Sequence, residues 1–361
     1  MSARRGWFAA AQAALLALAL AACAGTADPG AAPTAPVSSS PTSSPSAPAP
    51  EPTPEPTAER TTFRIATLKG PTTMGLVELM DEAAQGTARH DYQVTVYGTP
   101  DEVLPKILQG DVDVALVPAN LASVLYAKTG GDGGAKVKVA AINTLGVLQV
   151  LEAGDTVHAV ADLRGHTILS TGKGASPQYV LEHVLTEAGL DPTKDVTIEY
   201  LSEATEVAAR LAATPGAVAV LPQPYATVVT KQAEGVRVAI DLTDAWADVT
   251  PSRLVTGVVV VRTPFLAEHR AAFDEFLADY RASTQFTNEH PDEAGALIAA
   301  AGIVPAAAVA TAAIPASHVT YIDGADLRTD LDGYLAVLFA ANPASVGGAL
   351  PGDDFYYTPG G

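Results

Sequence analysis

Cysteine is almost absent from this 361-residue sequence, in which Cys23 is the only one. A single thiol excludes an intramolecular disulfide and a cysteine-based metal site, so the meaning of Cys23 depends on its position. Basic residues are also few, with 21 lysines and arginines against 40 aspartates and glutamates, which gives a formal net charge of −19. Binding to nucleic acid or, by charge, to an anionic membrane requires a basic face, so the composition argues against both.

The sequence also lacks the common catalytic motifs. Its seven histidines form neither an HExxH motif nor a pair at metal-ligand spacing, and no GxSxG nucleophile motif occurs. The acidic pairs Asp81-Glu82 and Asp101-Glu102 are expected on solvated helix faces. We therefore expect a binding protein rather than an enzyme, with no cofactor and no metal.

The first 22 residues have the layout of a signal peptide. Arg4 and Arg5 precede an apolar, alanine-rich run over residues 7–22 that is too short for a confident transmembrane helix. The run ends in Leu20-Ala21-Ala22-Cys23, which resembles the bacterial lipoprotein box. This resemblance implies that Cys23 is acylated, with palmitate for example, and anchors the mature protein in the membrane. The alternative is an ordinary cleaved signal in which the cysteine is incidental.

The segment after Cys23 is expected to be a disordered tether. Residues 24–60 are almost entirely Ala, Pro, Ser, Thr, Gly and Glu and show no apolar periodicity. Such a segment cannot bury enough apolar surface to fold, and its prolines keep it partly extended. We assign residues 23–61 to the lipidated cysteine and its tether, which would hold a folded domain close to a membrane.

From residue 62 onward, strand-like and helix-like patterns alternate. The expected strands are residues 63–68, 92–97, 112–117, 137–143, 167–170, 196–200, 217–221 and 254–261. The expected helices are residues 74–84, 99–108, 120–127, 177–187, 205–213, 264–284 and 292–301. Thr99 with Pro100 and Glu102 predicts a capping box, and Pro105 is expected to disturb the helix that follows.

The order of strand, loop, helix, strand, helix and buried strand occurs twice, which predicts two α/β lobes of similar construction. We expect lobe one to comprise residues 62–150 and 251–361, and lobe two residues 151–250. In such a layout the ligand lies in the cleft between the lobes, where the loops after the strand ends converge.

Several polar residues follow the expected strands of lobe one. Thr72 and Thr73 open the first helix, and Asn120 opens another after a buried strand. Helix amino termini offer free N–H groups, so these positions are candidates for ligand contact, although simple helix capping is the alternative. Asn143 and Thr144 end a strand just before the chain crosses to lobe two, and we expect them to line the floor of the cleft.

Lobe two supplies a matching set of candidates. Thr171, Lys173 and Ser176 lie on a glycine-containing loop between a strand and a helix, a setting that favours oxyanions, although the spacing is not that of a Walker loop. The alternative is that the glycines only form a tight turn. Gln223 lies between two prolines on a rigid loop and is a further candidate. The aromatic rings of Tyr97, Tyr225 and Trp246 could stack on a planar ligand, although aromatic residues more often pack in a core or on the surface.

Residues 66–246 resemble the solute-binding proteins of bacterial ABC importers for nitrate, sulfonates and thiamine-pyrimidine precursors. The segments that carry the resemblance are LKGPTTMGL (68–76), GDVDVA (110–115), VPANLA (117–122), NTLG (143–146), ADLRG (161–165) and LPQP (221–224). The resemblance implies a two-lobed type II periplasmic-binding-protein fold that closes like a Venus flytrap. It also implies a permease and its ATPase as partners, and a location on the outer face of the cytoplasmic membrane. Relatives often carry glutamate at the position of Gln223, so this chain lacks a negative charge there. If Gln223 faces the ligand, a cationic ligand is less favourable.

Two other functions remain open. Chorismate dehydratases of the menaquinone pathway share the two-lobed fold, so an enzyme is one alternative, but the export signal of this chain argues against a cytoplasmic enzyme. A lipoprotein that senses a solute without transporting it is the other. The hydroxyl-rich helix starts and Lys173 fit a sulfonate-like or nitrate-like oxoanion, whereas Gln223 and the aromatic residues fit a planar heterocycle such as a pyrimidine.

Overall fold

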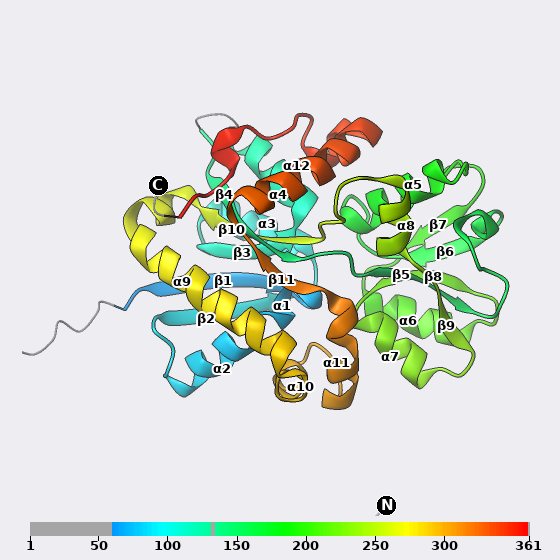
Figure 1. Ribbon diagram of the computed structural model, residues 1–361, viewed down its shortest axis with the longest axis horizontal. Helices are drawn as coiled ribbons and strands as arrows, with labels where there is room; N and C mark the ends of the chain where they lie inside the picture. Colours follow the sequence, from blue (N-terminus) through cyan, green and yellow to red (C-terminus); the bar gives the residue numbers. More distant parts are fainter. Residues whose placement is uncertain (1–59, 131–133, 360–361) are drawn as a thin grey trace, which may run out of the picture. The chain divides into compact units, whose positions relative to one another are not determined.

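The computed structural model describes residues 60–130 and 134–359 (Figure 1). The expected signal peptide, the lipidation site at Cys23 and nearly all of the expected tether therefore lie outside the described residues.

A six-stranded sheet forms the centre of what we call lobe one. Its strands lie in the order β11-β4-β10-β3-β1-β2. They are β1 (Thr62–Leu68), β2 (Asp91–Tyr97), β3 (Val114–Pro118), β4 (Val137–Thr144), β10 (Gly257–Arg262) and β11 (Val319–Ile322). Strand β1 pairs in parallel with β2 and β3, whereas β10 runs antiparallel to both β3 and β4. The carboxyl ends of β1, β3 and β4 consequently lie at one edge of the sheet.

A five-stranded sheet with the order β7-β6-β8-β5-β9 forms the centre of lobe two. Its strands are β5 (Leu148–Ala153), β6 (Thr167–Ser170), β7 (Thr197–Tyr200), β8 (Val218–Pro222) and β9 (Val236–Asp241). Strand β6 pairs in parallel with β7 and β8, and β5 runs antiparallel to β8 and β9. Lobe two thus repeats the central arrangement of lobe one, in which one antiparallel strand is inserted among parallel ones. Lobe one adds β11, which runs antiparallel to β4 at the edge of its sheet.

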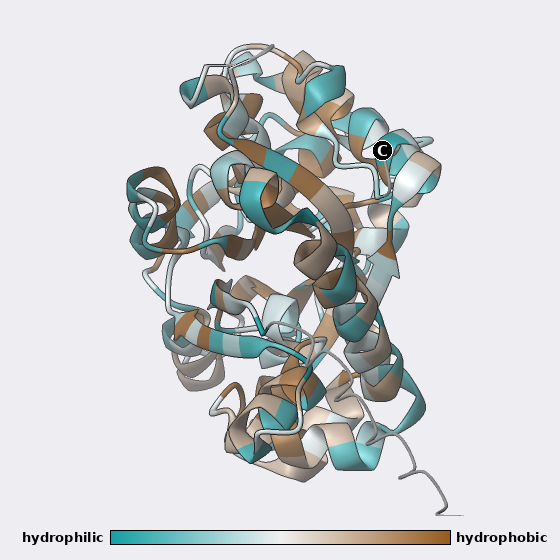
Figure 2. Cartoon of the chain, turned by 90° about the vertical axis from the view of Figure 1, so that its left-hand side faces the viewer, coloured by the Kyte–Doolittle hydropathy of each residue, from teal (hydrophilic) through white to brown (hydrophobic). Residues whose placement is uncertain are grey.

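Helices cover both sheets. Those of lobe one are α1 (Pro71–Met74), α2 (Val77–Gln85), α3 (Pro100–Gln109), α4 (Ala119–Lys128), α9 (Thr263–Glu289), α10 (Pro291–Ala300), α11 (Ala307–Ala313) and α12 (Gly324–Ala341). Those of lobe two are α5 (Ser176–Glu187), α6 (Ala204–Ala213), α7 (Tyr225–Gln232) and α8 (Leu242–Val249). Short 3-10 turns are η1 (Val160–Leu163), η2 (Pro315–Ser317), η3 (Pro343–Val346) and η4 (Asp353–Phe355). Figure 2 shows hydrophilic and hydrophobic residues alternating along these helices, which is the pattern of helices that bury one face.

The core of lobe one has one layer on each face of its sheet, because successive side chains of a strand point to opposite faces. Phe63 and Ile65 of β1 pack with Phe276 of α9 on one face. Ala66 belongs to the apolar cluster on the other face, which includes Tyr334 of α12. This second cluster continues into lobe two, so the two lobes share apolar packing on the side of α12.

The chain crosses between the sheets twice, in residues 145–147 and in residues 250–256. The boundaries that the sequence predicts between the lobes, after Val150 and after Thr250, remain predictions. Strand β5 begins at Leu148 and contains both Val150 and Leu151, so the first of these boundaries falls inside a strand of the second sheet.

Most expected elements are present, but some were missed. The helix expected over residues 74–84 is interrupted: α1 ends at Met74 and α2 begins at Val77. Strands β5, β9 and β11 and helices α7 and α8 were not foreseen. Gln149 and Glu152 break the apolar pattern of β5 although both are buried, and β9 is mostly half-exposed, so neither strand shows a clear period.

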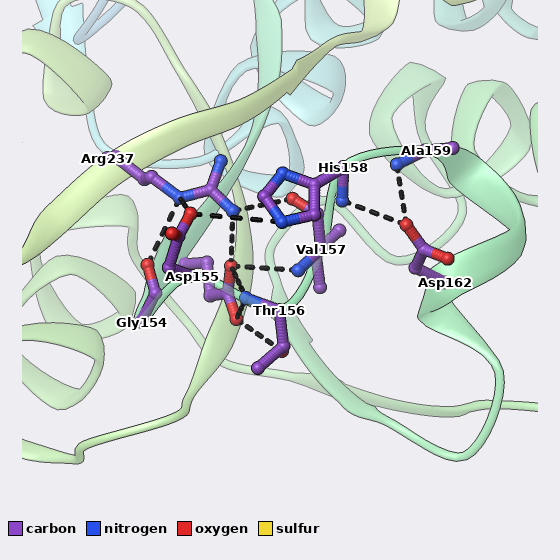
Figure 3. A network of polar contacts seen from close by, with 9 residues as sticks. Gly154, Asp155, Thr156, Val157, His158, Ala159, Asp162 and Arg237 are labelled. Atoms are coloured by element: carbon purple, nitrogen blue, oxygen red, sulfur yellow. Dashed lines mark hydrogen bonds and ion pairs between the residues drawn. The ribbon is translucent and has the colours of Figure 1, made fainter.

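Buried Glu152 anchors the loop that follows β5. Its carboxylate accepts hydrogen bonds from the Thr156 hydroxyl at 2.6 Å and from the Val157 N–H at 3.1 Å. Arg237 of β9 donates to the same carboxylate at 2.8 Å and to the Val157 carbonyl at 2.6 Å (Figure 3). The network fastens this loop to β9 and leaves no charge buried without a partner.

Candidate functional site between the lobes

Two adjoining hollows lie between the lobes, and Lys69, Thr205 and Tyr225 line both of them. The smaller one, which we call the polar chamber, has a volume of about 230 Å³. Its lining includes Lys69, Thr99, Thr171, Glu203, Thr205 and Tyr225. The larger one, the apolar chamber, has a volume of about 680 Å³. Helices α6 and α7 line it from lobe two and residues 299–305 line it from lobe one. Both lobes thus contribute to one continuous cleft.

One cation and one carboxylate line this cleft. Lys69 follows β1 of lobe one, and Glu203 precedes helix α6 of lobe two. In the part of the chain that the structure describes, neither side chain forms an ion pair within 4.0 Å. Glu203 accepts a hydrogen bond from the Thr205 hydroxyl at 3.2 Å. Both charged groups are therefore available to a ligand.

Tyr225 brings an aromatic ring to the junction of the two chambers. Burial and the nearby carboxylate of Glu203 raise the pKa of the Tyr225 hydroxyl to about 12. The hydroxyl is therefore protonated at neutral pH and can donate a hydrogen bond.

Thr72 and Thr73 lie at the start of α1, where both hydroxyls turn back toward the end of β1. They donate to the Leu68 carbonyl at 3.1 and 2.6 Å, and Thr73 also contacts the Thr67 hydroxyl at 2.9 Å. Both threonines are buried. Their contact with a ligand remains a prediction, since the hydrogen bonds shown here fasten the start of the helix to the sheet.

Asn143 and Thr144 are buried at the carboxyl end of β4. The Thr144 hydroxyl donates to Asn143 Oδ1 at 3.0 Å, whereas Asn143 Nδ2 has no hydrogen-bond partner among the described residues. A Cβ atom placed on Gly257 would lie 2.4 Å from Asn143 Oδ1 and 2.9 Å from Thr72 Cγ2. The structure thus gathers Thr72, Asn143 and Thr144 around Gly257, beneath the surface of the cleft.

Asn120 and Ser176 meet across the two lobes. The Ser176 hydroxyl donates to Asn120 Oδ1 at 3.2 Å, and Asn120 Nδ2 donates to the carbonyls of Ser345 at 3.0 Å and Gly174 at 3.4 Å. Both side chains are fully buried. In this conformation they join the lobes to each other.

The loop between β6 and α5 presents Thr171 to the polar chamber and Lys173 to solvent. Gly172 and Gly174 in this loop have φ angles of 71° and 78°, values that favour glycine. The predicted ligand contact from Lys173 remains untested, because its side chain is exposed and does not line either chamber.

Gln223 is buried within lobe two. Its Nε2 donates to Gln149 Oε1 at 3.0 Å, and its Oε1 accepts from the Thr227 hydroxyl at 2.8 Å and from the Thr227 N–H at 3.2 Å. The peptide bond between Gln223 and Pro224 is cis. Both ends of this amide are occupied inside the lobe, so ligand contact by Gln223 would require its rearrangement.

Of the three aromatic candidates, Trp246 has the core packing that was the alternative to ligand contact. Trp246 is fully buried, donates from Nε1 to the Ser252 carbonyl at 2.8 Å and packs against His183 and Tyr334. It is a core residue and does not face the cleft. Its apolar neighbours on α8 gave no sign of whether the ring packs inward or outward.

The sequence did not identify Glu203, Thr205 or the apolar chamber. Glu203 stands at the N-cap position of α6, where the sequence resembles an ordinary helix start. Ala208, Ala209 and Ala212 line the apolar chamber from the same helix, and their spacing leaves an open face of small residues. The spacing of these alanines in the sequence indicates a helix face of small apolar residues.

The described residues hold no candidate metal site and no membrane-spanning helix. Residues 60–130 and 134–359 contain no group of three or more His, Cys, Asp or Glu side chains that could hold a metal ion. Over the same residues, none of the helices has the length and apolar character needed to span a bilayer.

Comparisons with solved structures show a shared fold. A protein described as an ABC transporter from Parabacteroides distasonis is 22% identical, with a TM-score of 0.67 over 82% of this chain and 99% of that one. The periplasmic aliphatic sulphonate-binding protein SsuA from Escherichia coli is 20% identical, with a TM-score of 0.65 over 82% and 92% of the two chains. The alkanesulfonate-binding protein SsuA from Xanthomonas axonopodis pv. citri, bound to MOPS, is 17% identical, with a TM-score of 0.63 over 79% and 94%.

These similarities confirm the two-lobed α/β fold expected from the sequence, that of type II periplasmic-binding proteins. No curated protein matches the chain in sequence. Residues 91–294, which make up more than half of the chain, match the family described as NMT1/THI5 like. The chain therefore belongs to the NMT1/THI5-like family.

Proposed function

We propose that the protein is an extracytoplasmic solute-binding protein that captures a small molecule between its lobes and delivers it to an ABC importer. The observation that carries this proposal is the cleft itself, to which both lobes contribute lining residues. Membership of the NMT1/THI5-like family and the similarity to sulfonate-binding proteins support it. Ligand pockets are typically concave, mostly apolar and equipped with a few polar groups, which describes the two chambers together.

Closure of the lobes would follow from contact with both of them. A ligand shifts an equilibrium between open and closed forms only by its difference in affinity for the two. A solute that touches Lys69 on lobe one and Glu203 or Tyr225 on lobe two gains contacts as the cleft narrows. The closed form would then dock on a permease that works with an ATPase.

We also propose that Cys23 carries a lipid anchor, which places the protein on the outer face of the cytoplasmic membrane. The lipobox-like sequence that ends at Cys23 supports this part of the proposal. A tether beside the anchor would keep the protein at a high local concentration near its permease. Replacement of Cys23 by serine should abolish acylation, which mass spectrometry of the detergent-extracted protein would detect. An unchanged, acylated product would exclude this assignment.

Two classes of ligand fit the sequence, a sulfonate-like or nitrate-like oxoanion and a planar heterocycle. Lys69 supports the oxoanion, since an ammonium group without a protein partner favours a negative charge. Tyr225 supports a ring, which could stack on its face or accept its hydrogen bond. The solved structures that share this fold include sulfonate-binding proteins, so we propose a binding role and not a catalytic one.

A thermal-shift screen of the full chain tests the proposal. The compounds would be nitrate, sulfonates, pyrimidines, amino acids and riboflavin-like molecules. A ligand at about a hundred times its dissociation constant adds about 2.7 kcal/mol to the free energy of unfolding, which raises the melting temperature measurably. Lys69→Ala should weaken the effect of an oxoanion, and Lys231→Ala, which removes an exposed lysine outside both chambers, should not. If no compound shifts the melting temperature and one of them is instead converted to a product, the binding function is wrong.

A further inference from the structure

The apolar chamber is large and almost free of charge. Ala209, Ala212 and Val228 line it from lobe two, and Ile303 and Pro305 line it from lobe one. Its volume of about 680 Å³ falls in the range of pockets that hold drug-sized molecules. Lys69, at its junction with the polar chamber, is the only charged residue in its lining. The chamber therefore favours the apolar body of an organic molecule.

Nitrate and very small sulfonates do not match this chamber. Nitrate has no apolar surface, so it gains nothing from a wall of alanine, valine, isoleucine and proline side chains. A small ion at Lys69 would leave most of the apolar lining in contact with water, and the lobes could not close on it without burying an empty space. A ligand that contacts both lobes in the closed form therefore has to fill both chambers.

The polar chamber is not simply cationic. A Cβ atom placed on Gly98 would lie 3.7 Å from Glu203 Oε1 and 3.4 Å from Glu102 Oε1. Glu203 lines the polar chamber together with Lys69 and Gly98. Glu102 does not line it, and its Oε1 accepts hydrogen bonds from the Thr99 N–H at 3.2 Å and the Thr99 hydroxyl at 3.1 Å, but its charge lies close to the same glycine. A ligand with only negative charge would be attracted by Lys69 and repelled by both glutamates.

We infer that the ligand is a zwitterionic organic solute, with an anionic group at Lys69, an ammonium group at Glu203 and an apolar body in the apolar chamber. This inference rests on the proposed solute-binding function and specifies its ligand class. An ammonium group at Glu203 would also offset the negative charge of Glu102, because both carboxylates lie within 4 Å of a Cβ position on Gly98. The charged end and the apolar body would then contact both lobes at once.

Two matched sets of probe molecules separate the contribution of the ammonium group to affinity from that of the apolar ring. The first set is 3-(cyclohexylamino)propane-1-sulfonate, 4-cyclohexylbutane-1-sulfonate, which lacks its amine, and 3-aminopropane-1-sulfonate, which lacks its ring. The second set is L-phenylalanine, 3-phenylpropanoate and glycine, which differ in the same way. Isothermal titration of each into the full chain gives dissociation constants, and nitrate and a pyrimidine are titrated alongside.

In at least one set the complete zwitterion should bind at least about tenfold more tightly than either partial analogue, because a charge-assisted hydrogen bond or a filled apolar chamber is lost in each of them. Glu203→Gln should remove the advantage of the amine and leave that of the ring. Ala209→Phe should weaken the zwitterion by about tenfold or more by filling the chamber. Ala213→Phe is its control, because Ala213 is exposed on the same helix but does not line the chamber. Circular dichroism would verify that each variant is folded.

Three outcomes would overturn the inference, and they are distinguishable from one another. If nitrate, the pyrimidine or an amine-free acid binds while no zwitterion binds more tightly, the solute-binding function stands and the zwitterion is excluded. If none of these compounds and no other importer solute binds, the solute-binding function fails together with the inference. Binding of the zwitterion that is insensitive to both Glu203→Gln and Ala209→Phe would place it outside this cleft and also contradict the inference.

Discussion

The Ser176 hydroxyl of lobe two donates a hydrogen bond to Asn120 Oδ1 of lobe one over 3.2 Å. Both residues are the first or second in their helices, and both are fully buried. Asn120 also donates to carbonyls in both lobes, at Ser345 and Gly174. One side chain thus fixes the spacing between two helix starts that the sequence presented as separate ligand contacts.

Asn120→Ala should destabilise the protein even without a ligand. The substitution leaves the Ser345 carbonyl and the Ser176 hydroxyl without their partner, which costs about 1–3 kcal/mol of the free energy of unfolding. Ser176→Ala removes a single hydrogen bond and should cost about 1 kcal/mol. Urea denaturation measures both. If Asn120→Ala lowers ligand affinity but leaves the free energy of unfolding unchanged, Asn120 acts as a ligand contact and not as a connection between the lobes.

Gly146 lies in the first crossing segment, and a side chain there would collide with lobe two. A Cβ atom on Gly146 would lie 2.3 Å from Thr243 Oγ1, 2.7 Å from its Cγ2 and 2.9 Å from its Cβ. Gly146→Ala should therefore cost about 1–3 kcal/mol of the free energy of unfolding, as overpacking does. Adding Thr243→Ala removes the two nearest atoms and should restore part of this loss. A double-mutant cycle measured by urea denaturation gives the coupling between the two positions. An additive cycle would show that the crossing segment can move away from α8.

Acid should weaken lobe two through Glu152. Burial raises the pKa of Glu152, but hydrogen bonds from Thr156 and Val157 and the charge of Arg237 outweigh it, so the pKa lies below its ordinary value. A carboxyl group with a lowered pKa in the folded state stabilises the protein above the pKa of the unfolded chain, near 4.3, and this stabilisation is lost as the pH falls toward the folded value. Glu152→Gln should cost about 3 kcal/mol at pH 7.

The difference in free energy of unfolding between Glu152→Gln and the unaltered protein should shrink as the pH falls below about 4.3. Asp155→Asn is the control, because Asp155 contacts Arg237 at 3.1 Å but its side chain is 81% exposed. It should change stability by less than about 1 kcal/mol. Denaturation curves from pH 7 to pH 3 test both. A difference that stays constant over this range would show that Glu152 does not titrate differently in the folded and unfolded states.

How much of the molecule the sequence predicts depends on whether a feature is local. The strand at Gly257–Arg262 was foreseen because four consecutive valines favour a buried strand, and the capping box at Thr99 was foreseen because its residues are close in sequence. The proximity of both Glu203 and Glu102 to Gly98 could not be foreseen, since it depends on how two lobes are placed.

The same distinction between local and long-range features explains which residues of the candidate site the sequence could predict. Thr171 was expected in the cleft and lines it, because a loop after a parallel strand has few other places to lie. Trp246 was a candidate for the cleft with core packing as the alternative, and it is buried in the core; the sequence left both open because an aromatic ring on an amphipathic helix can satisfy either environment. Periodicity tells which face of a helix is apolar but not what covers that face. The alanines of α6 therefore indicate a face of small residues in the sequence, but not the chamber that lies against it.

Inside lobe two, a chain of hydrogen bonds runs from the Gln223 amide through the Gln149 amide to the Asp241 carboxylate. Its Nε2 donates to Gln149 Oε1 at 3.0 Å, and Gln149 Nε2 donates in turn to Asp241 Oδ2 at 3.4 Å. Gln223→Glu replaces a donor by an acceptor that faces the oxygen of Gln149. If the Gln149 amide turns over to donate to the new carboxylate, its oxygen faces Asp241 instead. Either orientation leaves two acceptors opposed, so the variant should lose about 1–3 kcal/mol of the free energy of unfolding at pH 7.

A second substitution tests this chain of hydrogen bonds. Asp241→Asn places an amide donor at the other end of this chain. In the variant with both substitutions, the Gln149 amide can flip, so that its Nε2 donates to the carboxylate introduced by Gln223→Glu and its Oε1 accepts from the amide introduced by Asp241→Asn. The double variant should therefore be more stable than Gln223→Glu alone, whereas Asp241→Asn by itself should be neutral or slightly destabilising. When protonated, the introduced carboxyl can donate to Gln149 Oε1, so the penalty of the single variant should shrink as the pH falls toward about 4 and grow as the pH rises. Urea denaturation at pH 4 and pH 7 measures all four proteins. If the double variant is no more stable than Gln223→Glu, the Gln149 amide does not relay a contact between position 223 and Asp241.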